Sequence, residues 1–501
     1  MNRSSLSKKL IYLVIAVALI YPLYQLGRPA GRSSDQSRTS TGGTLSQMRQ
    51  KYGFAESELG EINPASNTMK LASLGMRSPA ATILWGKADE YKNLHQWDRL
   101  KATLETIALL QPHYERVWEF QAHNMAYNVS SEFDDFRQRY RWVREGTDYL
   151  TRGFERNQQG TRLIWYTGWF YGQKLGMSDE KREFRQLFRN DTDFHDELRN
   201  LGINIDREEA LGPDGKPDNW LVGRLWLERG YELVDSGTEI TRQTPLNFFE
   251  TGPKWLVKHA DAVNREPPKD ADDAEAWKEW ETVVGLVWQR GANGWEKLGD
   301  RSIPTTSPFP IRLGGLDELA DQIKEKEDEF GAVVGDAWED EKQRLLSTLN
   351  DDQRVAWETP AEERTLKQEQ AVEMLQQYMQ PNVQGVAKRA KKNRVRAIEL
   401  ANEIALLGQK YSKTELYRSQ INFPYWAVRV AAEQEPETVR ARSTLAQAEL
   451  AYRDARSDDA IELYWDAFEQ WELVWNRFIR GDAVVANRVA DVVCGFIAGQ
   501  Q

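Results

Sequence analysis

The chain has 501 residues, which is enough for two or more domains, and its 40% of hydrophobic residues can fill sizeable cores. Its 77 acidic residues outnumber its 66 basic residues, and the resulting net charge of −11 argues against nucleic-acid binding, which needs a positive field. The single cysteine, Cys494, excludes an intrachain disulfide framework and any cysteine-based zinc or iron–sulfur site made by one chain.

The first apolar stretch, residues 10–26, carries no charge and predicts an uncleaved transmembrane signal anchor. A cleaved signal peptide and a buried helix are the alternatives. The short leading tail favours a cytoplasmic stub plus anchor over residues 1–30, a single-pass topology and an extracytoplasmic body, although the flanking positive charges differ little in number. Residues 31–64 predict a flexible polar linker. The residues expected within the bilayer include Leu10, Val14, Ala18, Tyr24 and Leu26.

Residues 65–204 show apolar residues at helical spacing, interrupted by turn signals such as Pro112. The spacing predicts helix–turn–helix units of about 34 residues, a length typical of helical repeats. In the second unit the partner helix is expected between Phe133 and Phe154. In the third unit a helix around Trp165 is expected to pair with a helix that starts at Ser178.

The first unit has a large apolar residue, a small residue, an aromatic residue and a second-helix apolar trio before a closing proline. These residues are Leu84, Ala88, Tyr91, Leu100, Leu104, Ile107 and Pro112. The pattern resembles the tetratricopeptide repeat family over about two units, with a weaker third, although Leu100 replaces that family's small residue in the second helix. The resemblance implies an all-α solenoid of helical hairpins whose concave surface binds a protein or peptide. The candidate groove residues are Trp85, Tyr91, Trp118, His123, Asn124 and Tyr127.

Beyond the repeats, the pattern remains helical. Residues 205–310 predict a helical middle region with loops, one of them from Gly291 to Pro310. Residues 311–380 predict a charged helical arm, and residues 381–501 a helical region that ends in a repeat-like hairpin. The basic run 388–396 is expected to be solvated or to pair with the acidic arm, with anionic lipid headgroups as the alternative.

No residue is predicted to be catalytic, to bind a cofactor or to hold a metal. The sequence lacks a phosphate-binding loop, a serine nucleophile elbow and a paired-histidine zinc motif. Asp193 and His195 could bind a cation, but a solvated acidic turn is the commoner meaning of such a cluster. For His123, a structural role, a place in the groove and a ligand role all stay open.

The predicted function is a membrane-anchored scaffold for protein–protein interaction at the cell envelope. Its expected partners are the lipid bilayer and an unidentified protein or peptide, not nucleic acid, and the oligomeric state stays open. The nineteen tryptophans suit helix packing, but they also allow a Trp-lined saccharide-binding protein or an enzyme. That alternative needs an open pocket with carboxylates, lined by Trp85, Trp118, Trp165 and Trp169. A purely structural envelope component is the third possibility.

Overall fold

The computed structural model describes residues 77–270, 272–360, 363–375, 378–390 and 392–478, together with Gly31–Arg32, Thr39–Ser40 and Gln47. The described chain is all-α, as predicted, with nineteen α-helices. Two short strands, β1 (Gly31–Arg32) and β2 (Thr39–Ser40), pair antiparallel. The predicted anchor over residues 10–26 lies outside the described residues, so its five named positions keep their status as a prediction.

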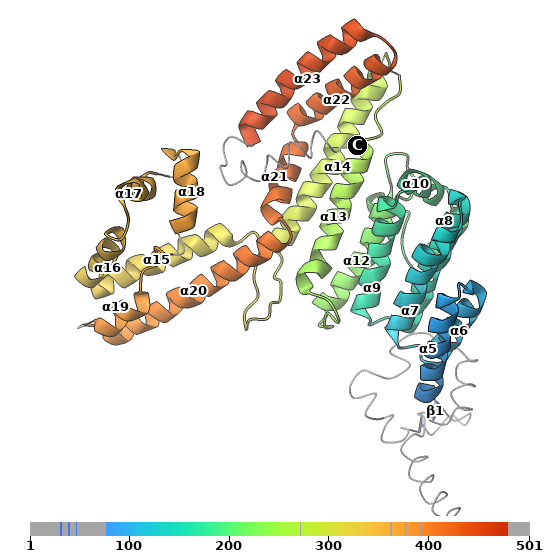
Figure 1. The fold of residues 1–501 in the computed structure, drawn as a ribbon, viewed down its shortest axis with the longest axis horizontal. Coiled ribbons are helices and arrows are strands. Elements are labelled where there is room, and N and C mark those ends of the chain that lie inside the picture. The colour runs from blue at the N-terminus through green and yellow to red at the C-terminus, as the bar shows by residue number, and fades with distance from the viewer. Residues whose placement is uncertain are drawn as a thin grey trace, which may run out of the picture. The chain divides into compact units, whose positions relative to one another are not determined.

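The chain divides into two compact units, one of residues up to 210 with 217–242, the other of 211–216 with residues from 243 onward. In the first unit the helices follow one another as hairpins (Figure 1). Its elements are α5 (Arg77–Asn93), α6 (Trp97–Leu110), α7 (Glu115–His123), the π-helix η1 (Asn124–Val129), η2 (Ser130–Glu132), α8 (Phe136–Arg156), α9 (Thr161–Phe170), the π-helix η3 (Tyr171–Leu175), α10 (Lys181–Arg189), α11 (Thr192–Asn200), η4 (Glu208–Ala210) and α12 (Asn219–Asp235).

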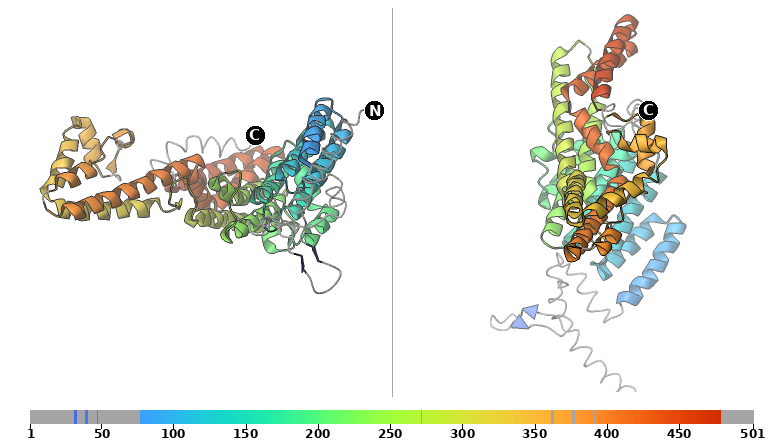
Figure 2. Two further views of the ribbon diagram at one scale, coloured as in Figure 1. Left: turned by 90° about the horizontal axis from the view of Figure 1, so that it is seen from below. Right: turned by 90° about the vertical axis from the view of Figure 1, so that its left-hand side faces the viewer.

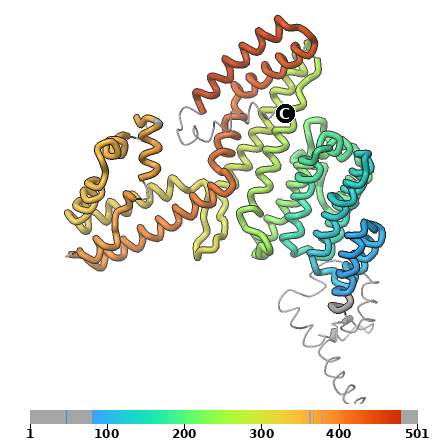
Figure 3. Tube along the Cα trace, viewed as in Figure 1, coloured from blue at the N-terminus to red at the C-terminus, as the bar shows by residue number. Residues whose placement is uncertain are grey.

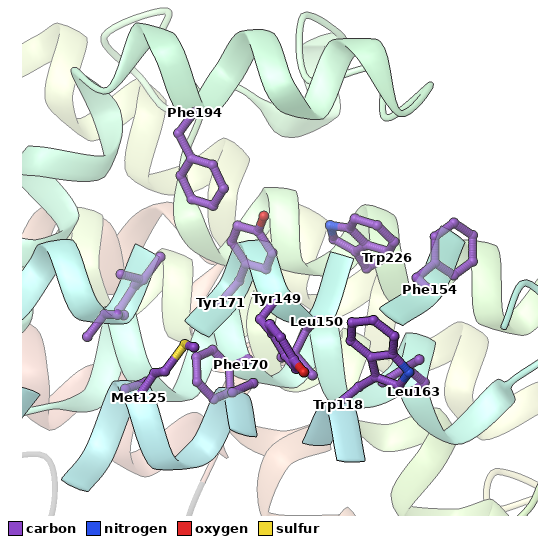
Figure 4. Close-up of a cluster of buried hydrophobic side chains, with 14 of the residues drawn as sticks. Trp118, Met125, Tyr149, Leu150, Phe154, Leu163, Phe170, Tyr171, Phe194 and Trp226 are labelled. Carbon is purple, nitrogen blue, oxygen red and sulfur yellow. The ribbon is translucent and has the colours of Figure 1, made fainter. Parts of the chain in front are cut away.

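Three helix pairs build the first unit. Helix α5 packs against α6, α7 with η1 packs against α8, and α9 with η3 packs against α12. The apolar periodicity explains the first pair, because Ala88, Leu100, Leu104 and Ile107 are all buried. Large rings from α7, α8, α9 and α12 fill the space between the later pairs (Figure 4). The result is one continuous apolar core through the unit.

The third pair differs from the expectation. The helix predicted after Ser178 is present as the short α10, but the main partner of α9 is α12, which comes about 40 residues later in the chain. The reason is a close backbone approach: a Cβ on Gly168 would lie 2.6 Å from the carbonyl oxygen of Gly223. Only glycine lets two helix backbones come that near, so a contact between distant residues selects the partner.

The segment between α9 and α12 is fixed to α8 by Asp191. This carboxylate caps α11 by accepting from the Phe194 N–H at 3.1 Å. It also accepts from the Tyr140 hydroxyl and from Arg144 Nη1, both at 3.0 Å. One side chain therefore starts α11 and ties it to the neighbouring long helix.

Gly168 gives a first testable prediction. Gly168→Ala is expected to lower the free energy of unfolding by about 1–2 kcal/mol, because overpacking against backbone outweighs the gain of about 0.5–1 kcal/mol from removing a helical glycine. In Gly86→Ala, the matched control, the new Cβ meets no atom within 4 Å, so the same change is expected to stabilise the protein. Denaturant unfolding followed by circular dichroism measures both. Shifts of equal sign would contradict the close approach of α9 and α12.

The second unit consists of hairpins of unequal length, traced in Figure 3. Its helices are α13 (Pro245–Asn264), α14 (Ala274–Asp300), α15 (Leu316–Val334), α16 (Asp336–Leu346), α17 (Asp351–Glu358), α18 (Leu366–Leu375), α19 (Val383–Arg389), α20 (Arg394–Gln420), α21 (Phe423–Glu433), α22 (Pro436–Arg453) and α23 (Ser457–Phe478).

The charged arm is one half of a hairpin. Helix α15 of the predicted arm packs along α20 of the predicted C-terminal region (Figure 2). The two predicted regions therefore form one helix pair. Arg396 of the basic run lies 2.6 Å from Glu329, and Lys326 lies 3.0 Å from Glu403. Arg396 therefore meets the acidic arm within the chain, whereas Lys388, Lys392 and Arg394 are exposed, so the run shows both of the outcomes expected for it.

The loop predicted from Gly291 starts later in the structure. Helix α14 continues to Asp300, and residues 301–315 form the connection, with a single bridge between Ile303 and Ile311. The glycines do not end the helix, since each lies where a neighbouring side chain packs directly against the helix backbone. A Cβ on Gly294 would lie 2.5 Å from Leu256, and one on Gly299 would lie 3.1 Å from Phe423. Packing outweighs the poor helix propensity of glycine here.

Candidate functional site

Two of the six predicted groove residues are interior. Trp118 is 7% exposed, its Nε1–H donates to the Pro112 carbonyl at 2.9 Å, and its ring packs 4.8 Å from that of Tyr149. Asn124 is 2% exposed and accepts from Asn128 Nδ2 at 2.8 Å. Both side chains lie on the side of their helix that packs against the core. Neither can line a surface groove, which corrects the prediction for these two positions.

The other four predicted residues reach the surface. Trp85 is half-buried, and its ring meets that of Phe120 edge-on at 5.5 Å. His123 is exposed and stacks on half-buried Tyr127, with ring centroids 4.4 Å apart. Tyr91 is half-buried and lies under the Arg99 guanidinium of α6 at 5.9 Å. Tyr91 thus belongs to the α5–α6 contact, while Trp85, His123 and Tyr127 join a larger aromatic surface.

That surface includes aromatic residues that the sequence analysis did not assign to the groove. Tyr166 of α9 places its hydroxyl 3.4 Å from His123 Nδ1, and its ring stacks on Trp169 at 5.4 Å. Both rings are half-buried. We call the set the aromatic ridge. It consists of Trp85, Phe120, His123, Tyr127, Tyr166 and Trp169.

The ridge lies on the first helices of the three pairs, α5, α7 with η1, and α9 with η3. Phe120, His123 and Tyr127 follow at intervals of three and four residues, and Tyr166 and Trp169 at an interval of three, which puts each group on one helix face. These spacings were available in the sequence. The proximity of the two groups was not, because it depends on how two separate helices pack.

Both helices change to π-helical geometry at matching places. Helix α7 runs into η1 directly after His123, and α9 runs into η3 directly after Phe170. A π-turn is rare and accommodates an extra residue, so it turns the following side chains relative to an α-helical path. In η1 this positions Tyr127 against His123 and against Phe170 of α9, 5.8 Å away. π-turns of this kind often mark functional surfaces.

Three cations border the ridge. Lys92 Nζ lies 5.6 Å from the Phe120 ring, and Lys174 Nζ lies 4.6 Å from the Tyr127 ring. Arg162 lies 4.8 Å from the Trp165 ring and 3.7 Å from a Glu119 oxygen. Cations at such distances interact favourably with the faces of aromatic rings. Arg162 is also held by a carboxylate, whereas neither lysine has a carboxylate oxygen within 4.0 Å among the described residues.

The titrating groups of the ridge have shifted pKa values. The side chain of His123 is exposed overall, but the groups packed around the imidazole partly desolvate it. This desolvation, with the nearby charges of Lys174 and Lys92, lowers the pKa of His123 below its ordinary value, so the imidazole is mostly neutral at pH 7. Burial also lowers the pKa of Lys174 and raises the pKa of Tyr127 to about 12. The Tyr127 hydroxyl therefore stays protonated near neutral pH. It is buried and has no hydrogen-bond partner among the described residues.

The arrangement suits recognition of another molecule by stacking and charge. Half-buried Trp, Tyr and Phe rings combine large contact area with few rotatable bonds, which is typical of protein-binding surfaces. The four tryptophans required by a saccharide platform do not form one open surface, since Trp118 and Trp165 are buried.

The burial of their side chains decides whether Asp193 and His195 can form the candidate cation site. His195 is buried, whereas Asp193 is exposed, so the two side chains do not face a common point. Within the described residues no group of three His, Cys, Asp or Glu side chains is arranged to hold a metal ion.

Comparisons with protein families, with curated protein sequences and with solved structures gave no match to this chain. Among the helices that the structure describes, none combines the length and the apolar character needed to cross a bilayer.

Proposed function

We propose that the protein is a membrane-anchored helical-repeat scaffold that binds another protein or an extended peptide on the aromatic ridge. The charge-free segment 10–26 supports the anchor. An extracytoplasmic body belongs to the same proposal. In this proposal the polar linker holds the body away from the bilayer.

The likeness to tetratricopeptide repeats belongs to the same proposal. The pairs α5–α6, α7–α8 and α9–α12 support it, since each consists of two packed helices and contributes to one core. In stacked two-helix repeats the equivalent helices form a continuous surface, and here the first helices carry the ridge. The third pair departs from the repeat pattern because α10 and α11 are inserted between its helices.

The observation that carries the proposal is the continuity of partly exposed rings across three helices. Trp85 meets Phe120, Phe120 precedes His123 by one turn, and His123 contacts both Tyr127 and Tyr166. Rings that served only the core would be covered, as Trp118 is. A row of such residues at the centre of an interface is where binding energy concentrates.

We expect the double variant Tyr166→Ala/Trp169→Ala to lose proteins that cross-link to the wild-type chain in intact membranes. Each aromatic anchor at an interface centre is worth about tenfold or more in affinity. The measurement uses the full chain with a photo-reactive group at exposed Ser131, followed by quantitative mass spectrometry.

Trp465→Ala serves as the control, because Trp465 is 68% exposed and belongs to α23 of the second unit. The control is expected to keep the cross-linked proteins. A cross-linking pattern that is the same in wild type and in the ridge variant would refute the ridge as the binding surface.

A further inference from the structure

The two lysines beside the ridge lie on different elements but near the same histidine. Lys174 of η3 lies 4.6 Å from the Tyr127 ring on which His123 stacks. Lys92 of α5 lies 5.6 Å from the ring of Phe120, which precedes His123 by three residues on α7. Neither lysine has a carboxylate oxygen within 4.0 Å among the described residues. Asp179 and Glu180 act on Lys174 from beyond ion-pair distance. Two cations without a direct carboxylate partner beside a neutral imidazole favour the arrival of a negative charge.

Hydrogen bonding points to the same place. The Tyr127 ring stacks on His123 and lies 4.6 Å from Lys174 Nζ. Its hydroxyl is buried and has no hydrogen-bond partner among the described residues. Buried polar groups are normally paired, and an unpaired one calls for an explanation such as a bound water or ion. His123 and Tyr166 add further hydrogen-bonding atoms, joined at 3.4 Å.

We propose that Lys92, His123 and Lys174 form a subsite for the side-chain carboxylate of an acidic peptide that lies across the aromatic ridge. This inference rests on the proposed function and names the chemistry of the partner. The rings on either side, Trp85 with Phe120 and Tyr166 with Trp169, take apolar side chains that flank the acidic residue.

A carboxylate fits these observations better than a nucleic-acid backbone. A phosphate backbone needs a row of cations, each of which neutralises one phosphate. The ridge offers two lysines without an ion pair among the described residues, while Arg162 pairs with Glu119, and Arg242 pairs with Glu115 and Glu119. Because both arginines are already paired within the chain, too few cations remain to follow a phosphate backbone.

The subsite makes binding depend on pH. The charged and titrating groups around His123 are Lys92 on α5, Glu119 on its own helix, Tyr127 on η1, Tyr166 on α9 and Lys174 on η3. A bound carboxylate stabilises the imidazolium, so it raises the pKa of His123 from its lowered value. Binding is then tightest below the pKa of the free protein and weakens as pH rises through the pKa of the complex.

The test measures fluorescence anisotropy of the full chain in nanodiscs with a labelled peptide in which Glu alternates with Leu. We expect Lys92→Gln/Lys174→Gln to weaken binding about tenfold or more, since two charge-assisted hydrogen bonds are lost. Lys87→Gln, on the exposed side of α5, is the matched control and is expected to bind as the wild type does. Binding by the wild type is also expected to weaken severalfold between about pH 5.5 and 7.5. His123→Gln is expected to remove this pH dependence, and the control His95→Gln is expected to keep it.

Three results would overturn the subsite. One is equal affinity for the Glu peptide and for the same peptide with Gln in place of Glu, with binding lost only in the Tyr166→Ala/Trp169→Ala variant. This outcome would leave the proposed function standing. The second is tighter binding of a labelled oligothymidine that the lysine variant abolishes. The third is no binding of either peptide, in which case the cross-linking experiment decides separately on the proposed function.

Discussion

Replacement of Glu433 by alanine is expected to lower the free energy of unfolding of the second unit by about 3–5 kcal/mol. Glu433 is 0% exposed at the end of α21 and accepts hydrogen bonds from two nitrogens of Arg442 on α22. Its carboxylate also lies 3.6 Å from Arg429 Nε, and Arg429 in turn pairs with Asp261 of α13. The carboxylate thus joins α21 to α22, and Arg429 beside it joins α21 to α13.

The size of the effect follows from what the substitution leaves behind. Arg429 and Arg442 have side chains that are 16% and 19% exposed, so water can replace the lost carboxylate only in part. Removing one member of a buried ion pair costs more than the pair itself contributes, because the remaining charge stays desolvated. Arg442 also lies 5.1 Å from the Trp471 ring, so a displaced guanidinium would loosen α23 as well.

Glu437→Ala is the matched control for Glu433. Glu437 belongs to α22 and pairs with Arg440 at 3.4 Å, but its side chain is 45% exposed. Such surface pairs contribute less than about 1 kcal/mol, so the control is expected to be close to wild type. Hydrogen exchange in denaturant, followed on peptides from α21 and α22, measures both variants. Equal losses at the two positions would mean that water reaches the Glu433 network.

The sequence predicts the local structure of this protein well and its distant contacts poorly. The spacing of Ala88, Leu100 and Leu104 reflects burial on one side of a helix, which neighbouring residues determine, and the α5–α6 hairpin follows from it. The pairing of α9 with α12 depends on Gly168 meeting Gly223 across an insertion. No periodicity encodes such a contact, so the nearer helix α10 was the simpler prediction.

The candidate site likewise combines local contacts that the sequence predicts with distant contacts that it does not predict. His123 and Tyr127 are both predicted groove residues and lie four residues apart, whereas Tyr166 joins them from the next helix pair. Trp118 was assigned to the groove although its ring packs on Gly153 of α8, where a Cβ would lie 2.6 Å from the indole. A tryptophan in sequence looks the same whether its indole is buried or exposed. Only the partner helix decides which it is.

Trp226→Ala is expected to destabilise the first unit by about 3–5 kcal/mol, because a fully buried indole leaves a cavity that the core cannot close. Trp226 is 0% exposed on α12, and its ring meets that of Phe154 edge-on at 5.2 Å (Figure 4). It is one of the side chains through which α12 completes the shared core of the three pairs. Hydrogen exchange on peptides from α8 and α12 measures the loss.

Trp169→Ala supplies the comparison within the same unit. Trp169 is half-buried and stacks on Tyr166 and on Trp165, so its removal exposes little new core and is expected to cost about 1 kcal/mol. The contrast bears on function, because a ring that contributes little to stability is free to contribute to binding. A stability loss at Trp169 as large as that at Trp226 would place the ridge in the core, and the proposed binding surface would then have no support. A small loss, together with the lost cross-links of the ridge variant, would identify Trp169 as a residue that serves the partner.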